Sequence, residues 1–333
     1  MHHDVDVLVL RALGLGDLLV AVPALRLLRR ALPQHRIVLA APAALGPVVA
    51  RIDAVDEHLP CPSPDALPAT AAPALTTPDV AVNLHGRGPQ SHAALDALAP
   101  RRRVGHAAPG WDGPAWTDDP DRPERRRWCD LLAGCGLVAP ADAAAGADDL
   151  RLPAPAPAGH VVVHPGAAYG SKRWPVERFA AVARALAADG RRVVVTGGPA
   201  ERGLTRLVPG EDRGGDTDLA GLVDLVAGAD LLVSGDTGVA HLATAFGVPS
   251  VTLFGPVGPE QWGPPSGGPH VTLTVPQVRR GDRFADDPDP ALLAVGVDDV
   301  LGAVARLGAG ARGFAGGAPR VWRGVPGDLP TPR

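Results

Sequence analysis

The chain has 333 residues, of which 46% are hydrophobic and 20% charged, a composition typical of a globular protein with room for two domains. The formal charge of −4 gives no support to nucleic acid as a partner, and three cysteines without CxxC spacing predict neither a disulfide framework nor a zinc site. Because no disulfide framework is indicated, we expect a cytoplasmic protein. No apolar run reaches the roughly 18 to 20 residues that cross a bilayer.

The first half of the chain alternates apolar runs with helical patterns. A continuous apolar run at 5–10 predicts a buried strand, and Asp17 opens a helix whose apolar residues recur at helical spacing to Leu32. Further strands are expected at 37–41, 55–59, 79–84 and 103–105, and helices at 42–52, 91–99 and 123–135. This alternation predicts an α/β fold with a parallel sheet and helices on both faces.

The stretch 139–159 combines Ala, Pro, Asp and Gly without periodicity, which is typical of a linker. We therefore expect an N-terminal domain over 1–145, a linker over 146–158 and a C-terminal domain over 159–308. The second half restarts the same pattern, with strands expected at 160–164, 192–196, 231–234, 250–254 and 271–275. Helices are expected at 175–189, around 200–208, from the stretch after 218–221 to Gly228, and at 239–246. We expect a last helix at about 290–307, with packing back on the N-terminal domain as one option, and a flexible Gly/Pro-rich tail over 309–333.

A glycine-containing loop follows the strand at 160–164 and reads HPGAAYGSKRW. It holds Lys172, the only lysine in the sequence, which suggests a need for a compact ammonium that arginine cannot meet. The order strand, loop, helix presents backbone N–H groups to an anion, so we interpret the loop as part of a phosphate site. An ordinary surface lysine is the alternative.

The segment SGDTGVAHLATA turns from a strand into a helix. Free N–H groups at Thr237 and Gly238, the threonine hydroxyl and the His241 imidazole converge there, an arrangement that suits a diphosphate. The alternative is that Asp236 only caps the helix and His241 lies in the core.

Two further glycine-containing loops end strands of the first half. Gly14-Leu15-Gly16 suggests a dinucleotide fingerprint, but that motif needs a small residue where this chain has Leu19, which disfavours a nicotinamide-dependent oxidoreductase. Asp17 is then either a carboxylate favoured by the helix dipole or a base at the mouth of a cleft, with Gly14 and Gly16 leaving room for an acceptor. We expect the loop holding His85 and Arg87 to lie on the same acceptor side.

Metal chemistry is not indicated by the sequence. The Asp-x-Asp triplets lie at the terminus or in loops, and none directly follows a strong buried strand. We therefore expect no metal at the site. The runs 101–103 and 125–127 are typical of solvated arginine faces, although an anionic acceptor could use them.

Several segments resemble glycosyltransferase family 9, the heptosyltransferase-like enzymes. They read LRALGLGDLLVAVPALRLLRRALP, NLHGRGPQSH, HPGAAYGSKRWPVERFA, VTGGPAE and LAGLVDLVAGADLLVSGDTGVAHLATAFGVPSVTLFGP, and the resemblance runs to about residue 275. It implies a GT-B fold, in which two Rossmann-like domains with parallel sheets face a cleft. It also implies an inverting, metal-independent transfer without a cofactor, from ADP-heptose or a similar nucleotide sugar to a glycan, glycolipid or small-molecule acceptor.

The resemblance also assigns roles by motif. Asp17 matches the catalytic base, Lys172 the lysine on the donor phosphates and Glu201 the acid on the donor ribose. The residues that match the donor-binding turn or the base pocket are Asp236, Thr237, Gly238, His241 and Leu222. The hydroxyl residues that some members place before the lysine are alanines here, at 167 and 168, and Gly258 replaces an acid, so the donor sugar stays open.

The sequence leaves several acceptors and one alternative to catalytic activity open. The acceptor is the inner core of a lipopolysaccharide, a cell-wall glycan or a secondary metabolite, with peripheral contact at the inner face of the membrane as an option. A catalytically silent nucleotide-sugar binding protein would keep the Lys172 site, and Asp17 is the feature that speaks against it.

Overall fold

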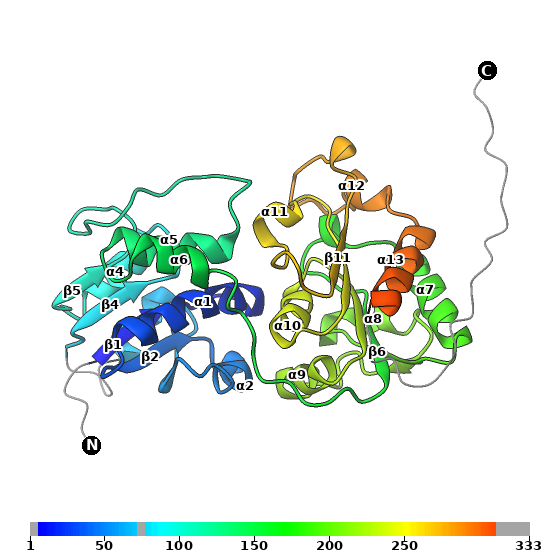
Figure 1. Cartoon of the computed structure of the whole chain (residues 1–333), viewed down its shortest axis with the longest axis horizontal. Coiled ribbons are helices and arrows are strands. Elements are labelled where there is room, and N and C mark those ends of the chain that lie inside the picture. The colour runs from blue at the N-terminus through cyan, green and yellow to red at the C-terminus, as the bar shows by residue number, and fades with distance from the viewer. Residues whose placement is uncertain (1–5, 72–76, 311–333) are drawn as a thin grey trace.

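The computed structural model describes residues 6–71 and 77–310. Two α/β units lie side by side, joined by an extended segment that passes between them on one side (Figure 1). The predicted flexible tail lies outside the described residues from 311 on, whereas 309 and 310 end the last helix.

The N-terminal unit is a five-stranded parallel sheet with the order β3-β2-β1-β4-β5. Its strands are β1 (Asp6–Leu10), β2 (Arg36–Ala41), β3 (Glu57–Pro60), β4 (Val80–Asn83) and β5 (Arg102–Val104). Its helices are α1 (Leu15–Ala31), α2 (Gly46–Val49), α3 (Leu67–Ala71), α4 (Gln90–Asp96), α5 (Glu124–Gly134) and α6 (Pro140–Gly146). The central strand β1 is apolar throughout its described side chains because helices cover both faces of a parallel sheet.

The C-terminal unit is a six-stranded parallel sheet with the order β11-β10-β9-β6-β7-β8. Its strands are β6 (His160–His164), β7 (Arg192–Val195), β8 (Glu211–Asp212), β9 (Leu231–Gly235), β10 (Ser250–Leu253) and β11 (His270–Leu273). Its helices are α7 (Val176–Ala188), α8 (Arg202–Thr205), α9 (Leu219–Ala227), α10 (Gly238–Phe246), α11 (Pro259–Trp262), α12 (Pro290–Leu293) and α13 (Val297–Gly310). The two sheets confirm the α/β class and the parallel strands expected from the alternating pattern.

Three differences from the expected elements change how the units pack. Part of the irregular stretch forms α6, which an N-terminal proline and alanines favour and which packs on α1 and α5. The single helix expected at 290–307 is broken into α12 and α13, and the Asp299 side chain accepts from the N–H of Gly296 between them. The last helix packs on α7, β10 and β11 rather than on the N-terminal unit, because Val300, Ala303 and Val304 complete the C-terminal core.

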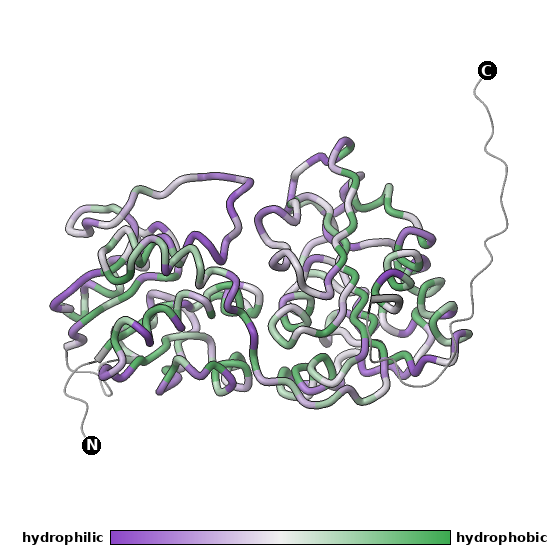
Figure 2. The backbone as a smooth tube through the Cα atoms, in the orientation of Figure 1, coloured by the Kyte–Doolittle hydropathy of each residue, from purple (hydrophilic) through white to green (hydrophobic). Residues whose placement is uncertain are grey.

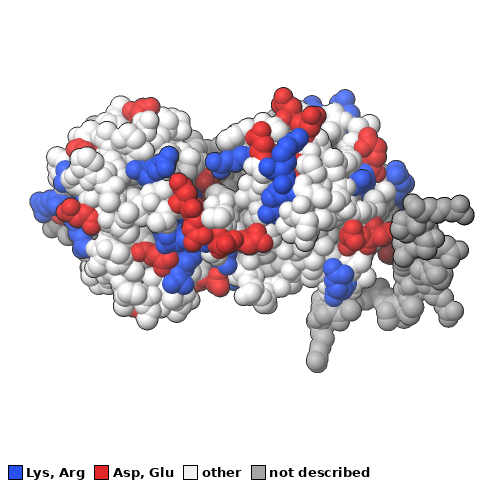
Figure 3. All heavy atoms as spheres, turned by 90° about the horizontal axis from the view of Figure 1, so that it is seen from above, with Lys and Arg blue, Asp and Glu red and all other residues white. Residues whose placement is uncertain are grey.

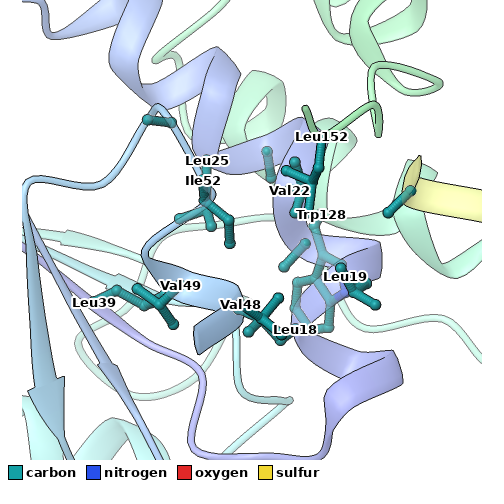
Figure 4. Close-up of a cluster of buried hydrophobic side chains, with 14 of the residues drawn as sticks. Leu18, Leu19, Val22, Leu25, Leu39, Val48, Val49, Ile52, Trp128 and Leu152 are labelled. Atoms are coloured by element: carbon teal, nitrogen blue, oxygen red, sulfur yellow. The ribbon is translucent and has the colours of Figure 1, made fainter. Parts of the chain in front are cut away.

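Helix α1 lies at the centre of the molecule. Its side chains from Leu18 to Leu28 are buried, Arg26 excepted, because α1 packs on its own sheet, on α5 and α6, and on α10 of the other unit. One hydrophobic cluster therefore runs through both units, from Leu25 of α1 to Leu242 and Phe246 of α10. Figure 4 shows side chains of this cluster, among them Leu18, Leu19, Val22 and Leu25 of α1, Val48 and Val49 of α2, and Trp128 of α5. We call this cluster the shared core.

Two further cores belong to one unit each. One fills the outer face of the C-terminal sheet under α7 and α13, and the other fills the face of the N-terminal sheet under α3 and α4. Hydrophobic colouring is accordingly concentrated inside both units, with hydrophilic colouring on peripheral loops (Figure 2).

Polar contacts also join the units around the shared core. Arg51 donates to Asp224 Oδ1 at 2.6 Å, and Arg125 donates to the carbonyl of Gly263 at 3.1 Å. Arg26 of α1 holds the linker through the carbonyl of Asp149 at 3.1 Å and that of Arg151 at 2.6 Å.

Basic and acidic side chains are interspersed over the face seen in Figure 3. Among the described helices, none is both long and apolar enough for a membrane span.

Candidate active site

The N-terminal unit contributes Asp17 from the first turn of α1. The helix begins at Leu15, two residues earlier than expected, with Gly14 at its N-cap and no side-chain cap. A carboxylate is favoured there by the helix dipole. The Asp17 side chain is 33% exposed, and Arg11 at the end of β1 donates to its Oδ1 at 3.3 Å. Asp17 is thus held at the carboxyl end of the sheet while it keeps access to solvent.

The C-terminal unit contributes the loop after β6. Residues 170–172 form a single 3₁₀ turn, and the Lys172 ammonium donates to Asp236 Oδ2 at 2.6 Å. Lys172 is 22% exposed and Asp236 only 7%. The structure therefore brings together the two motifs that were predicted to form one site, and Lys172 is not an ordinary surface lysine.

The turn into α10 leaves hydrogen-bonding groups available. Thr237 is the N-cap residue without a side-chain cap, so the reading of Asp236 as a simple capping residue is wrong. The buried hydroxyls of Thr237 and Ser234 have no hydrogen-bond partner among the described residues. Buried polar groups normally have partners, and the first N–H groups of a helix have none within it. The free N–H and hydroxyl groups of this turn can therefore donate hydrogen bonds to a bound oxyanion.

The two halves of the site meet at glycines. A Cβ atom on Gly16 would lie 2.8 Å from Cδ2 of His241, and one on Gly238 would lie 3.0 Å from Cβ of Leu15. Both distances are shorter than ordinary van der Waals contact, so α1 and α10 approach closely because these positions lack side chains. Asp17 consequently lies beside the turn into α10.

The surroundings of His241 favour its neutral imidazole. Burial lowers its pKa from the ordinary value near 6.5, and the carboxylates of Asp236 and Asp17 only partly oppose that shift. Its ring also contacts Trp262 edge to face, with centroids 6.0 Å apart. A neutral imidazole can donate one hydrogen bond to a phosphate oxygen without carrying charge.

Glu201 and Leu222 lie farther along the C-terminal unit. The Glu201 carboxylate accepts from the N–H of Gly198 at 2.7 Å and lies 4.0 Å from Nε2 of His164. Burial lowers the pKa of His164, and Glu201 opposes the shift. Leu222 is half-buried on α9 and packs against the shared core. Among the described contacts none joins Leu222 to Lys172 or Asp236.

The predicted acceptor side has a more open geometry. A Cβ on Gly14 would make only ordinary contact with Asp17 Oδ2 at 3.5 Å, and one on Gly86 would meet no atom within 4 Å. Burial lowers the pKa of His85, with Arg11 adding to the shift and Asp17 opposing it, which places His85 near both. Arg87 is 64% exposed and lies 3.8 Å from Asp118.

The structure also shows groups that the sequence did not single out. Arg11 lies at the end of β1 beside Asp17, and Ser234 lies at the end of β9 beside the turn into α10. Arg11 follows an apolar strand and resembles any strand-ending cation, so only the fold reveals its partners. Over the described ranges, no group of three or more His, Cys, Asp or Glu side chains is placed to hold a metal ion.

A pocket of about 440 Å³ lies away from this site, between α1 and the linker. It is lined by Arg26, Arg29, Arg30, Asp53, Ala54, Asp149 and Arg151. Three of its arginines already pair with aspartates: Arg26 with Asp53 and Asp149, Arg29 with Asp56 and Arg30 with Asp149. The pairs with Asp149 fasten the linker to α1.

Two Rossmann-like units with parallel sheets define the GT-B fold of glycosyltransferases. A family 9 glycosyltransferase from Veillonella parvula DSM 2008 superposes with a TM-score of 0.77 at 20% identity, covering 93% of this chain and 99% of that one. An E. coli heptosyltransferase solved with ADP gives a TM-score of 0.67 at 21% identity, covering 91% of this chain and 99% of the other. These likenesses show the fold.

The family match is carried by the sequence of the second half. Residues 137–276 match the model of glycosyltransferase family 9 (heptosyltransferase). Lipooligosaccharide heptosyltransferase 2 of Haemophilus influenzae is 31% identical over 134 residues, which is 36% of this chain and 39% of that protein. The aligned part thus spans about two fifths of this curated relative. The resemblance to glycosyltransferase family 9 is confirmed, and it rests on the C-terminal domain.

Proposed function

We propose that the protein is an inverting, metal-independent glycosyltransferase that moves heptose from ADP-heptose to a hydroxyl of a glycan, glycolipid or metabolite. The observation that carries the proposal is the meeting of Asp17 from one unit with Lys172, Asp236 and His241 from the other. An active site divided between two domains suits two substrates, one on each.

The donor diphosphate would bind the C-terminal unit. An ammonium has three donors, so Lys172 can keep its bond to Asp236 and still donate to phosphate oxygens. The N–H groups of Thr237 and Gly238, the Thr237 hydroxyl and the neutral His241 complete the set. These donors stabilise the charge that grows on the departing diphosphate and thereby lower the barrier. Glu201 is proposed to bind the donor ribose and Leu222 to line the base pocket.

The acceptor would bind the N-terminal unit, between the Gly14–Gly16 loop and His85 and Arg87. Asp17 takes the proton of the attacking hydroxyl as that oxygen bonds to the anomeric carbon, from the face opposite the diphosphate. The configuration at that carbon is then inverted. General-base catalysis typically contributes ~10²- to 10⁴-fold, and we expect Asp17→Asn to lose kcat by that factor with ADP affinity unchanged.

The inner core of a lipopolysaccharide is the acceptor that we propose, because heptosyltransferases acting on lipooligosaccharide are among the matched relatives. The protein would then work in the cytoplasm, with peripheral contact at the inner membrane face where such a glycolipid is presented. The oxidoreductase alternative is not favoured, because Leu19 is 1% exposed in the shared core and cannot approach a pyrophosphate.

Calorimetric titration of ADP, UDP, GDP, dTDP and NAD into the wild type and Lys172→Ala tests the donor. We expect selective ADP binding that Lys172→Ala weakens by at least about tenfold, because a charge-assisted contact to phosphate contributes on the order of 1.5–3 kcal/mol. Arg184→Ala, on the exposed side of α7, is the control and should bind ADP like the wild type. Preference for another nucleoside diphosphate would change the donor, and NAD binding insensitive to Lys172 would favour the oxidoreductase.

A further inference from the structure

Arg11 is a buried cation next to the proposed base. Its side chain is 1% exposed at the carboxyl end of β1. Burial lowers its pKa from the ordinary value, and the carboxylates of Asp17 and Glu124 oppose the shift. A buried guanidinium is costly to desolvate unless partners surround it.

Those partners are specific groups of the acceptor side. Nε donates to the main-chain carbonyl of Asp17 at 2.9 Å, and Nη2 donates to its Oδ1 at 3.3 Å. Nη1 donates to the carbonyl of Leu84, directly before the His85 loop. The Cζ atom of the guanidinium lies over the Trp128 ring, 4.6 Å from its centroid, which adds a cation–π contact. The planar guanidinium of Arg11, with its fork of N–H donors, thus joins the first turn of α1, the Asp17 carboxylate and the residue after β4.

The contacts of the two carboxylate oxygens differ. Arg11 bonds to Oδ1, whereas Oδ2 points toward Gly14, which has no side chain to cover it. We propose that Arg11 is a positioning residue that orients the Asp17 carboxylate so that Oδ2 receives the acceptor proton. The inference rests on the proposed function, because it assumes that Asp17 is the base.

Arg11→Lys tests the proposal, since lysine keeps the positive charge and loses the fork. Misplacement of a reacting group by about 1 Å can cost on the order of 10²-fold, so we expect kcat to fall by about that factor. The Kd of ADP and the KM of the acceptor should stay within about threefold. In the Asp17→Asn background the same substitution should lower kcat less than about twofold further, because two residues acting as a unit are not additive.

Arg127→Lys is the matched control. Arg127 is also buried, at 2%, and stacks on a tryptophan, with 4.2 Å from its Cζ to the Trp116 ring, but it pairs with Glu124 instead of Asp17. We expect this variant to lower Tm while kcat stays near that of the wild type. A structural role for buried arginine would affect both variants alike.

Several results would overturn the inference. They are a wild-type kcat in Arg11→Lys, an undiminished effect of that substitution in the Asp17→Asn background, or an equal fall of kcat in Arg127→Lys. Should Arg11→Lys fail to fold, as ADP titration and Tm would reveal, Arg11→Gln at lower temperature replaces it. Arg11→Gln removes the charge as well as the paired N–H donors, and the same smaller effect in the Asp17→Asn background is expected. Near-wild-type turnover of Asp17→Asn would instead refute the proposed base, independently of Arg11.

Discussion

His106 lies in the N-terminal unit between a carbonyl and two tryptophans. Its Nδ1 donates to the carbonyl of Pro114 at 3.1 Å, and its ring lies edge-on to Trp116 at 4.9 Å. Burial, which outweighs that hydrogen bond, lowers the pKa of His106 to about 4. Because the unfolded chain binds the proton more readily, the stability that neutral His106 provides is complete above about pH 6.5 and is lost as the pH falls toward 4.

We therefore expect His106→Asn to lose less stability than the wild type between pH 6.5 and 4. Urea unfolding at intervals over pH 4–8 measures this difference. Burial lowers the pKa of His270 to about 4 as well, so a remaining slope in the variant is expected. Parallel stability curves for the two proteins would contradict the prediction.

Gly16 is the residue at which the two halves of the site touch. Gly16→Ala would place a methyl group 2.8 Å from the His241 ring and push the donor turn away from Asp17. We expect kcat to fall by at least about tenfold, since small displacements of reacting groups have large effects on rate. Gly308→Ala in α13, where a Cβ would meet no atom within 4 Å and which lies outside the site, is the control. Equal steady-state rates for the two variants would show that the close approach is unimportant.

Some residues of this site could be predicted from the sequence, whereas their contacts and Arg11 could not. Lys172 and the turn at Asp236 could be found because a single lysine and a strand-to-helix glycine turn are local signals. Their hydrogen bond could not, since it joins positions 64 residues apart. Arg11 was missed for the same reason, because its significance depends on Leu84 and Asp17 being folded against it.

Every side chain of helix α1 from Leu18 to Leu28 except Arg26 is buried, because the helix packs on neighbours from both units. Leu25→Ala should therefore lower the free energy of unfolding by about 2–5 kcal/mol, the usual cost of a leucine cavity in a core. Leu207→Ala, at a side chain that is 59% exposed, should change it by less than about 0.5 kcal/mol. Chemical denaturation compares the two, and equal losses would mean that α1 is loosely packed.

At the scale of elements, prediction succeeded where a pattern was long. Buried strands such as β6 and helices such as α7 were located to within a residue. The two-residue strand β8 and the helix α6 were missed, since the first carries no pattern and the second is alanine-rich with little apolar contrast. The break between α12 and α13 depends on one glycine and on capping by Asp299.

The molecule as a whole has a core that belongs to neither unit alone. Unfolding one unit would expose the apolar faces of α1 or α10, so we expect a single cooperative thermal transition. ADP, although bound by the C-terminal unit, should raise the Tm of this whole transition. Differential scanning calorimetry checks both points, and two resolved peaks, one of them insensitive to ADP, would contradict them.

The shared core also limits how related proteins can be recombined. A chimera cut at the linker would set α1 of one parent on α10 of another, and the close approach of Gly16 to His241 would have to survive between surfaces that never coevolved. Exchanging whole domains to alter donor choice should thus fail more often than grafting the loops after β6 and β9. For protein engineers, the transferable unit is the loop, and the pair α1 and α10 must come from one parent.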